Sequence, residues 1–165
     1  MEHPYQLVAC FDMLPQPGDR VYNGAQGWCP QVALKRRFWF ADGNDQAGLQ
    51  AIDRFMQAVH PFSLTFGNRA QPSFMPVEVI ELSDAEAVRH FHLSFMSAMG
   101  DAITNKFPER ESLAFYPHMT ISWQGKPVVD PEKFIHTTHV VATIWLLQQQ
   151  PEMGDDIVRK VYQLR

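Results

Sequence analysis

Cysteine, charge and long apolar runs are all scarce in this sequence of 165 residues. The two cysteines, Cys10 and Cys29, lack the Cys-x-x-Cys spacing of a zinc ribbon. Two cysteines also cannot supply the disulfide framework of a small secreted domain, so we expect two buried thiols. No run approaches the about 18 consecutive apolar residues of a membrane-spanning helix, and the first residues lack the profile of a signal peptide. We therefore expect a soluble, cytoplasmic protein with no membrane partner.

The charge of the chain is small and slightly negative. Charged residues make up 19% of the sequence, the formal net charge is −4, and the isoelectric point is near 5.9. These values argue against a protein that coats nucleic acid through a broad basic surface, although a local basic groove stays compatible with them. With 45% hydrophobic residues, the chain can bury a substantial core as a single domain spanning residues 1–165.

Hydrophobic periodicity predicts an α+β fold. Alternating apolar and polar residues predict strands, and apolar residues at helical spacing predict helices. The Ser-x-x-Glu sequence from Ser83 to Glu86 has the form of a capping box, which predicts the start of a helix. Several connections are too short for crossovers, so we expect mostly antiparallel sheets. The predicted elements are strands at 5–11, 31–40, 62–67, 77–82, 117–123, 139–147 and 157–164, helices at 45–60 and 83–102, a short helix opening at Asp130, a loop at 21–30, and turns at 68–72 and 151–156.

The segment Phe115–Trp123 places a histidine and two hydroxyl groups on one face of a strand. Successive strand side chains point to opposite faces, so His118, Thr120 and Ser122 share a face, and the residues between them form an apolar face. A neutral imidazole can transfer a proton near pH 7, and a hydroxyl beside it can hold an anionic oxygen. The pattern therefore predicts phosphate chemistry, although His-x-Thr also occurs by chance in strands without any catalytic role.

A second strand, at 31–40, carries cations on its polar face. Gln31, Lys35 and Arg37 share that face in a regular strand, whereas Arg36 points to the other one. A cation would offset the charge of a phosphodiester held there. Basic residues also protect exposed strand edges from pairing, so a structural role for Lys35 and Arg37 stays open.

These two strands resemble the motif strands of the 2H phosphoesterase superfamily, whose bacterial members include the RNA 2′,3′-cyclic phosphodiesterases, also called 2′-5′ RNA ligases. Tyr116-Pro-His-Met-Thr-Ile121 matches the second His-x-Thr motif, and the order of the elements is similar over most of the chain. The resemblance implies a bilobal, pseudo-twofold arrangement of two mostly antiparallel sheets flanked by helices, with a shared cleft. It implies no cofactor and no metal.

The first motif departs from the pattern of the superfamily. Where the superfamily has histidine and threonine, this chain has Gln31 and Ala33. In the mechanism that the resemblance implies, one imidazole activates water or a hydroxyl, and the other protonates the leaving oxygen. Glutamine can donate a hydrogen bond to a phosphoryl oxygen but cannot take up a proton near neutral pH. Loss of one general acid or base typically removes about 10²- to 10⁴-fold in rate.

We expect a phosphate-binding cleft between the strands at 31–40 and 117–123. His118 and Thr120 are the candidate catalytic residues. Three functions stay open: a divergent phosphodiesterase for RNA 2′,3′-cyclic phosphates or for other cyclic or 2′-5′ linked nucleotides, a binding module for a phosphorylated nucleotide or RNA end, and a protein-interaction scaffold. The sequence indicates neither the oligomeric state nor a substitute for the missing histidine. The candidate phosphate and ligand contacts are Gln31, Lys35, Arg37, Ser122 and Tyr116, the last of which could stack on a base or belong to the core.

Overall fold

The computed structural model, which describes residues 3–14, 16–21, 29–150 and 155–165, has an α+β fold. The fold class predicted from the sequence is therefore confirmed. The strands are β1 (Tyr5–Cys10), β2 (Arg20–Val21), β3 (Gln31–Phe40), β4 (Phe62–Ala70), β5 (Val77–Asp84), β6 (Ile103–Asn105), β7 (His118–Trp123), β8 (Lys126–Pro127), β9 (Thr138–Val141), β10 (Thr143–Gln149) and β11 (Asp156–Gln163). The helices are α1 (Asp45–Met56) and α2 (Glu86–Met99), with short 3₁₀ helices η1 (Ala41–Gly43), η2 (Gly100–Ala102), η3 (Pro108–Arg110), η4 (Ser112–Ala114) and η5 (Pro131–Lys133).

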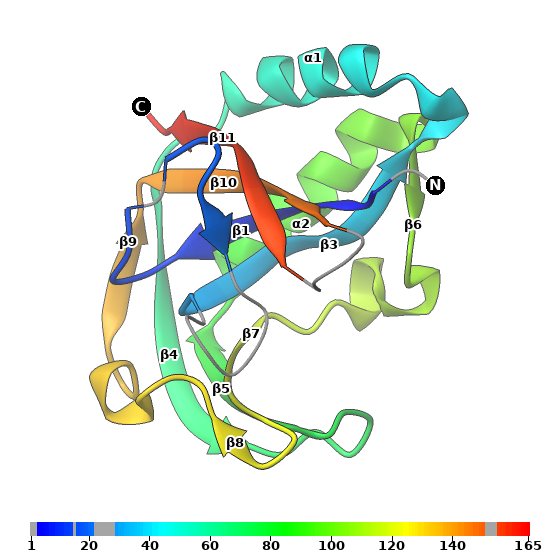
Figure 1. Cartoon of the computed structure of the whole chain (residues 1–165). Helices are drawn as coiled ribbons and strands as arrows, with labels where there is room; N and C mark the ends of the chain where they lie inside the picture. Colours follow the sequence, from blue (N-terminus) through cyan, green and yellow to red (C-terminus); the bar gives the residue numbers. More distant parts are fainter. Residues whose placement is uncertain (1–2, 15, 22–28, 151–154) are drawn as a thin grey trace.

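The strands form one continuous sheet rather than the two expected sheets, because the two motif strands, β3 and β7, pair with each other. Its order is β2-β11-β10-β1-β3-β7-β5-β4-β9, with β6 beside β3 and β8 beside β7. All of the strand pairs in the described part of the chain are antiparallel. Strands β3 and β7 join the two halves of this sheet at the pair Val32 and Met119. As Figure 1 shows, two segments far apart in the sequence thus lie side by side at the centre of the molecule.

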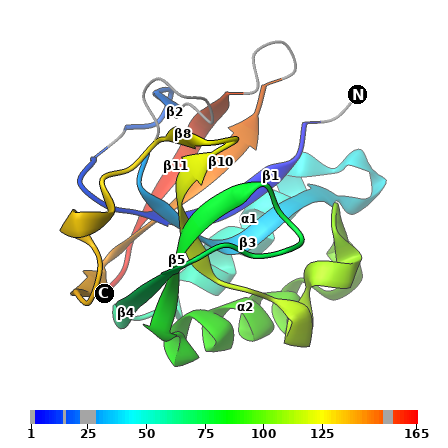
Figure 2. The same cartoon turned by 90° about the horizontal axis from the view of Figure 1, so that it is seen from below.

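The two α-helices pack on one face of the sheet and bury its apolar side chains. Ile52 of α1, Phe95 of α2, Val32 and Met119 all belong to one core. Burying a side chain of this kind contributes about 1.5–3 kcal/mol. Figure 2 shows α2 below the sheet, on the side away from β2 and β8. The strand residues that alternate with the core residues therefore point away from the helices. No helix among the described residues is long and apolar enough to cross a membrane.

The predicted strand at 139–147 is in fact two strands that belong to different halves of the sheet. β9 pairs with β4, whereas β10 pairs with β1. The chain changes partners at Ala142, whose carbonyl oxygen accepts a hydrogen bond of 2.9 Å from the backbone N–H of Leu164. An apolar, β-branched run predicts extended backbone but does not reveal which strands its two ends pair with.

The capping box predicted at Ser83 is also wrong. Ser83 and Asp84 complete β5, and α2 begins at Glu86. This segment stays extended because β5 pairs with β4 up to Asp84, which lies opposite Thr65. The Ser83 hydroxyl donates to the carbonyl oxygen of Thr65 at 3.4 Å instead of capping the helix.

Other predicted boundaries shift by a few residues. The two helices end at Met56 and Met99, earlier than predicted, and β4 continues to Ala70 through the predicted turn because it pairs with β5 there. The short helix predicted at Asp130 is the 3₁₀ turn η5. Of the two thiols that we expected to be buried, Cys29 is buried and Cys10 is only partly so. Most of the loop predicted at 21–30 and of the turn predicted at 151–156 lies outside the described residues.

Candidate functional site

The pairing of β3 with β7 decides which motif residues face one another. Because Val32 lies opposite Met119 in an antiparallel pair, Ala33 falls opposite His118, and Gln31 falls opposite Thr120. Directly opposed residues point to the same face of a sheet. Since Val32 and Met119 belong to the core under the helices, these four residues share the face that points away from it. The sequence-based prediction that the two strands present their motif positions to a common face is consistent with this register.

A cavity of about 160 Å³ opens on this face. Among the predicted site residues, His118, Tyr116 and Arg37 line it. Gln31, Thr120 and Ser122 are not among the described residues that line it, although they lie on the same two strands. The complete lining is Gln6 from β1, Ala33, Arg36 and Arg37 from β3, Phe107 and Tyr116 from the segment between β6 and β7, and His118 from β7.

His118 is held in one tautomer. Its Nδ1 lies 2.8 Å from the backbone carbonyl oxygen of Tyr116, and because a carbonyl only accepts, Nδ1 carries the hydrogen. Burial, together with the positive charge of Arg36, lowers the pKa of His118 to about 4, against the opposing effects of the Tyr116 carbonyl and Glu81. The ring is therefore neutral at pH 7, and Nε2 can accept a proton or a hydrogen bond.

This depressed pKa predicts that the fold loses stability as the pH falls from about 6.5 to about 4. The His118 pKa is 6.5 in an unfolded chain and about 4 in the folded protein, so the unfolded state takes up the proton first and gains from acidification. The shift corresponds to about 3 kcal/mol. Urea unfolding over this pH range should show a shallower pH dependence in His118→Gln than in the natural protein. Equal slopes in the two proteins would contradict the prediction.

Arg36 reaches the cavity, whereas Lys35 does not, which reverses the orientations predicted from a regular strand. The ladder between β1 and β3 shifts register twice, between Tyr5 and Leu7 and again between Leu7 and Val8. Each shift places an extra residue in β3, and such bulges change the direction in which side chains point. After them, Lys35 is fully buried, and Arg36 and Arg37 both line the cavity.

Lys35 is not a ligand contact, because its ammonium group is buried and forms an ion pair with Glu111. Its Nζ lies 2.9 Å from Oε1 of Glu111, and Oε2 of Glu111 lies 3.1 Å from Nε2 of the buried His92. Burial lowers the pKa of Lys35, and the nearby Glu111 carboxylate opposes this effect. For Glu111, burial opposes ionisation, but His92 and Lys35 outweigh it and lower its pKa. The direct contact supports an ionised Lys35–Glu111 pair, which anchors the segment that carries Phe107 and Tyr116.

The two arginines of the cavity differ in how their charges are satisfied. Arg37 donates from both of its terminal nitrogens to Asp156, at 3.0 and 3.2 Å. Arg36 makes one long contact of 3.4 Å with the carbonyl oxygen of Tyr116, and its buried Nε has no hydrogen-bond partner among the described residues. Burial lowers the pKa of Arg36, and so does the charge of Arg110. A guanidinium with an unpartnered N–H, next to a neutral imidazole, can donate a hydrogen bond to a phosphate oxygen.

Tyr116 forms part of the cavity wall rather than of the core. Its ring centroid lies 5.1 Å from that of His118, and its hydroxyl donates to Oε1 of Glu81 at 2.5 Å. Burial and the Glu81 carboxylate raise the pKa of Tyr116 far above its usual value. Its hydroxyl is therefore held by Glu81, and its ring face is the part that it can offer to a ligand.

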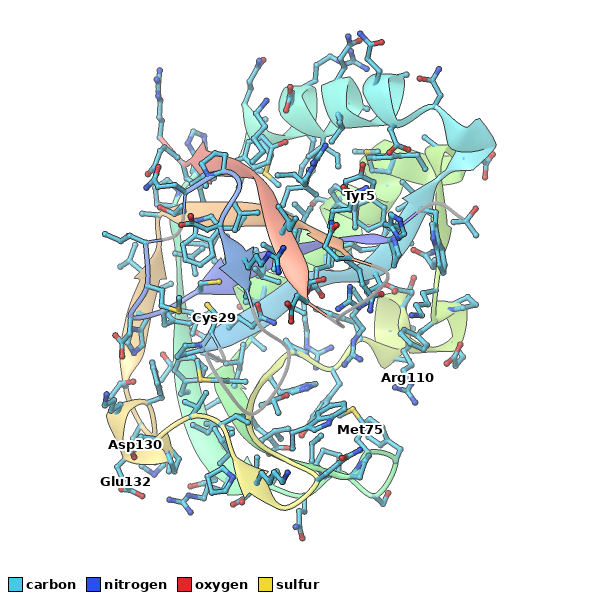
Figure 3. The ribbon with its side chains drawn as sticks, viewed as in Figure 1. Tyr5, Cys29, Met75, Arg110, Asp130 and Glu132 are labelled. Carbon is cyan, nitrogen blue, oxygen red and sulfur yellow. The ribbon has the colours of Figure 1, made fainter. Side chains whose placement is uncertain are left out.

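An aromatic and cationic rim continues outward from this wall. The Arg110 guanidinium lies over the rings of Phe107 and Phe74, at 5.4 and 5.6 Å from their centroids. Figure 3 shows Arg110 on the segment between β6 and β7, with Met75 on the neighbouring connection between β4 and β5. Aromatic and guanidinium groups of this kind can stack on a nucleobase. Sequence analysis missed this rim because no motif marks its members, which come from two separate connections.

A larger cavity, of about 590 Å³, lies between α1 and β11. It does not share the chemistry of the first one. Asp53 in its wall is paired with Lys160 at 2.7 Å and accepts a hydrogen bond from Tyr162 at 2.8 Å. No cluster of three or more histidine, cysteine or acidic residues in the described part of the chain could hold a metal ion. We therefore take the cavity beside β3 and β7 as the candidate site.

Comparison with known proteins finds similarity in fold and not in sequence. No protein-family model and no curated protein matches this chain. Among solved structures, a phosphoesterase matches with a TM-score of 0.64 and 12% identity, over 99% of each chain. LigT of Escherichia coli in complex with 3′-AMP matches with a TM-score of 0.60 and 12% identity, over 99% of each chain. TT0787 of Thermus thermophilus matches with a TM-score of 0.54 and 14% identity, over 98% of each chain.

Proposed function

We propose that this chain, which has the fold of LigT and the 2H phosphoesterases, binds the phosphate group of a nucleotide or of an RNA end in the cavity beside β3 and β7. The observation that carries the proposal is the convergence of Arg36, Arg37 and His118 on one cavity. Guanidinium groups bind phosphate oxygens through charge-assisted hydrogen bonds. The buried Nε of Arg36 has no hydrogen-bond partner among the described residues, and a phosphate oxygen could accept a hydrogen bond from it.

A nucleotide fits the surroundings of the cavity better than a bare phosphate. Tyr116 and Phe107 line the cavity, and Phe74 and Arg110 extend it with surfaces that suit a base. Structures of Escherichia coli LigT hold 3′-AMP, ATP or phosphate. Their fold is shared with this chain, which supports a ligand of the same class. A cytoplasmic location belongs to the same proposal, because it gives access to nucleotides and RNA ends.

Calorimetric titration with 3′-AMP and with inorganic phosphate tests this function directly. We expect saturable binding of both, tighter for 3′-AMP, and weaker binding as salt is raised because the contacts are ionic. A protein that binds neither ligand at low salt would contradict the proposal. That result would instead favour a protein-interaction scaffold.

Arg36→Met is expected to weaken the binding of 3′-AMP by about 10- to 100-fold, because a hydrogen bond to a charged group contributes about 1.5–3 kcal/mol. The matched control is Arg159→Met, which removes the same charge from an exposed position on β11. The measurement is the dissociation constant of 3′-AMP for each variant. An equal loss in both variants would show that net charge, rather than a contact in the cavity, determines affinity.

Hydrolysis of cyclic phosphodiesters, including RNA 2′,3′-cyclic phosphates, is a second candidate function. It is favoured by the unprotonated Nε2 of His118, which suits a general base. In this role Thr120 would orient the phosphate, with Ser122 as an outer contact on the same strand face. Gln31, opposite Thr120, would donate a hydrogen bond to the phosphate rather than a proton. Loss of cyclic-nucleotide turnover in a folded His118→Ala variant would support this function, and unchanged turnover would exclude it.

A further inference from the structure

The cavity holds a hydrogen-bond acceptor whose orientation is determined by its neighbour. Gln6 of β1 lines the cavity, and its Nε2 donates to Oδ2 of Asp156 at 2.8 Å. An amide oxygen and nitrogen are assigned from their hydrogen bonds, and an ionised carboxylate can only accept. The NH₂ group of Gln6 must therefore face Asp156. This leaves the amide oxygen Oε1 as the group that Gln6 can offer to a ligand in the cavity.

Asp156 orients both Arg37 and Gln6, so that a cation and a hydrogen-bond acceptor lie side by side. It is the first residue of β11, and its side chain is fully buried. The carboxylate that accepts from Gln6 also accepts two hydrogen bonds from Arg37, at 3.0 and 3.2 Å. The guanidinium can only donate and the amide oxygen can only accept. A ligand that fills this part of the cavity must therefore present an anionic oxygen and a donor close together.

A phosphate ester with a neighbouring hydroxyl group meets both requirements. An ionised phosphate has acceptor oxygens, which suit Arg36 and Arg37 and would be repelled by the oxygen of Gln6. The hydroxyl on the adjacent ribose carbon is a donor, and it lies within one carbon–carbon bond of the phosphate-bearing carbon. A 2′-deoxynucleotide 3′-phosphate lacks this hydroxyl, and in a 2′,3′-cyclic phosphate both oxygens are esterified.

We infer that Gln6, oriented by Asp156, is a specificity-determining residue that selects an open ribose 2′- or 3′-phosphate with a free hydroxyl beside the phosphate. This inference rests on the proposed binding of a phosphorylated nucleotide, and it adds which form of the nucleotide the cavity prefers. Gln6 accepts a hydrogen bond from the hydroxyl, while the arginines bind the phosphate. The 2′-hydroxyl group is also the feature by which proteins distinguish RNA from DNA at a given site.

The test compares 3′-AMP with 2′-deoxyadenosine 3′-phosphate, which differ only in the hydroxyl. For the natural protein we expect 3′-AMP to bind about tenfold more tightly, as one hydrogen bond typically provides. In Gln6→Leu we expect the ratio to fall to about twofold or less, because 3′-AMP loses affinity and the deoxy ligand does not. The control Gln50→Leu, on the exposed side of α1, should keep the ratio of the natural protein.

Asp156→Asn supplies a second readout. Asparagine can donate to the oxygen of Gln6, which lets the amide turn its NH₂ group into the cavity, and it no longer neutralises Arg37. We expect both ligands to bind more tightly in this variant and the preference for 3′-AMP to fall. A purely structural role for Asp156 would weaken both ligands and leave their ratio unchanged, and that result would overturn its assignment as a positioning residue.

The comparison of the two ligands with the natural protein needs no substitution, so it stays decisive even if a variant fails to fold. Equal affinities for 3′-AMP and its deoxy form would overturn the inference while leaving the proposed function in place. An equal loss of both ligands in a folded Gln6→Leu variant would overturn it as well. Failure of the natural protein to bind 3′-AMP, the deoxy form and inorganic phosphate would overturn the proposed function and, with it, this inference.

Discussion

The double change Gln31→His and Ala33→Thr is expected to raise turnover of 2′,3′-cyclic nucleotides by about 10²- to 10⁴-fold over the natural protein, which is the usual contribution of a general acid or base. The register of β3 and β7 explains why this pair of positions matters. Position 31 lies opposite Thr120, and position 33 lies opposite His118. The double variant would place an imidazole and a hydroxyl on each side of the strand pair, where the natural protein has them only on β7.

The necessary control is to add His118→Ala to the double variant Gln31→His/Ala33→Thr. If the gain arises from two imidazoles acting together, removing His118 should abolish it, because a single proton-transfer group would again be left. Gln50→His, which adds an imidazole on α1 instead, should produce no gain. Initial rates with 2′,3′-cyclic AMP provide the measurement. Turnover by the natural protein that equals that of the double variant would show that another group already replaces the missing histidine.

Glu111→Gln is expected to lower the free energy of unfolding by about 3–5 kcal/mol, the usual effect of removing one partner of a buried ion pair. The side chains of Lys35 and Glu111 are 0% and 4% exposed, so little water reaches the charge that would be left unpaired. His92, which lies 3.1 Å from the other carboxylate oxygen, would also lose an ionised neighbour. Urea unfolding at pH 7 measures the effect.

The contribution of charge can be separated from that of packing with two further variants. Replacing both partners, as Lys35→Met with Glu111→Leu, leaves no buried charge unpaired and should cost much less than the single change. Glu109→Gln alters a carboxylate that is 64% exposed, so it should have almost no effect on stability. A loss in Glu111→Gln that does not exceed the loss in Glu109→Gln would contradict the prediction.

The same buried pair has a consequence for ligand binding. Glu111 belongs to the connection between β6 and β7, and Phe107 and Tyr116 of this connection form one wall of the cavity. The ion pair with Lys35 ties that wall to β3, the strand that carries Arg36. A variant that weakens the pair should therefore weaken 3′-AMP binding as well as stability, although neither of its members lines the cavity.

Some features of this protein follow from the sequence by itself, because they depend on residues close together in the chain. The alternation of polar and apolar residues around His118 determines that His118 and Thr120 share a strand face, and this two-residue period needs no knowledge of the partner strand. The same local patterns predicted both α-helices, the antiparallel pairing and the α+β class. The resemblance of the motif strand to the 2H phosphoesterases was local too, and the fold that it implied is shared with solved structures of a phosphoesterase and of Escherichia coli LigT.

Other features were decided only by the tertiary structure, because they depend on contacts between distant residues. Two register shifts against β1 turned Lys35 inward and Arg36 toward the cavity, and a regular alternation cannot predict where a ladder will shift. Lys35 finds its partner 76 positions away, and Arg37 finds Asp156 119 positions away. Whether a cation on a strand meets a ligand or an internal carboxylate is therefore determined by which side chains folding brings beside it. The local pattern predicted the strand face on which His118 lies, whereas long-range packing determined which charged side chains surround it.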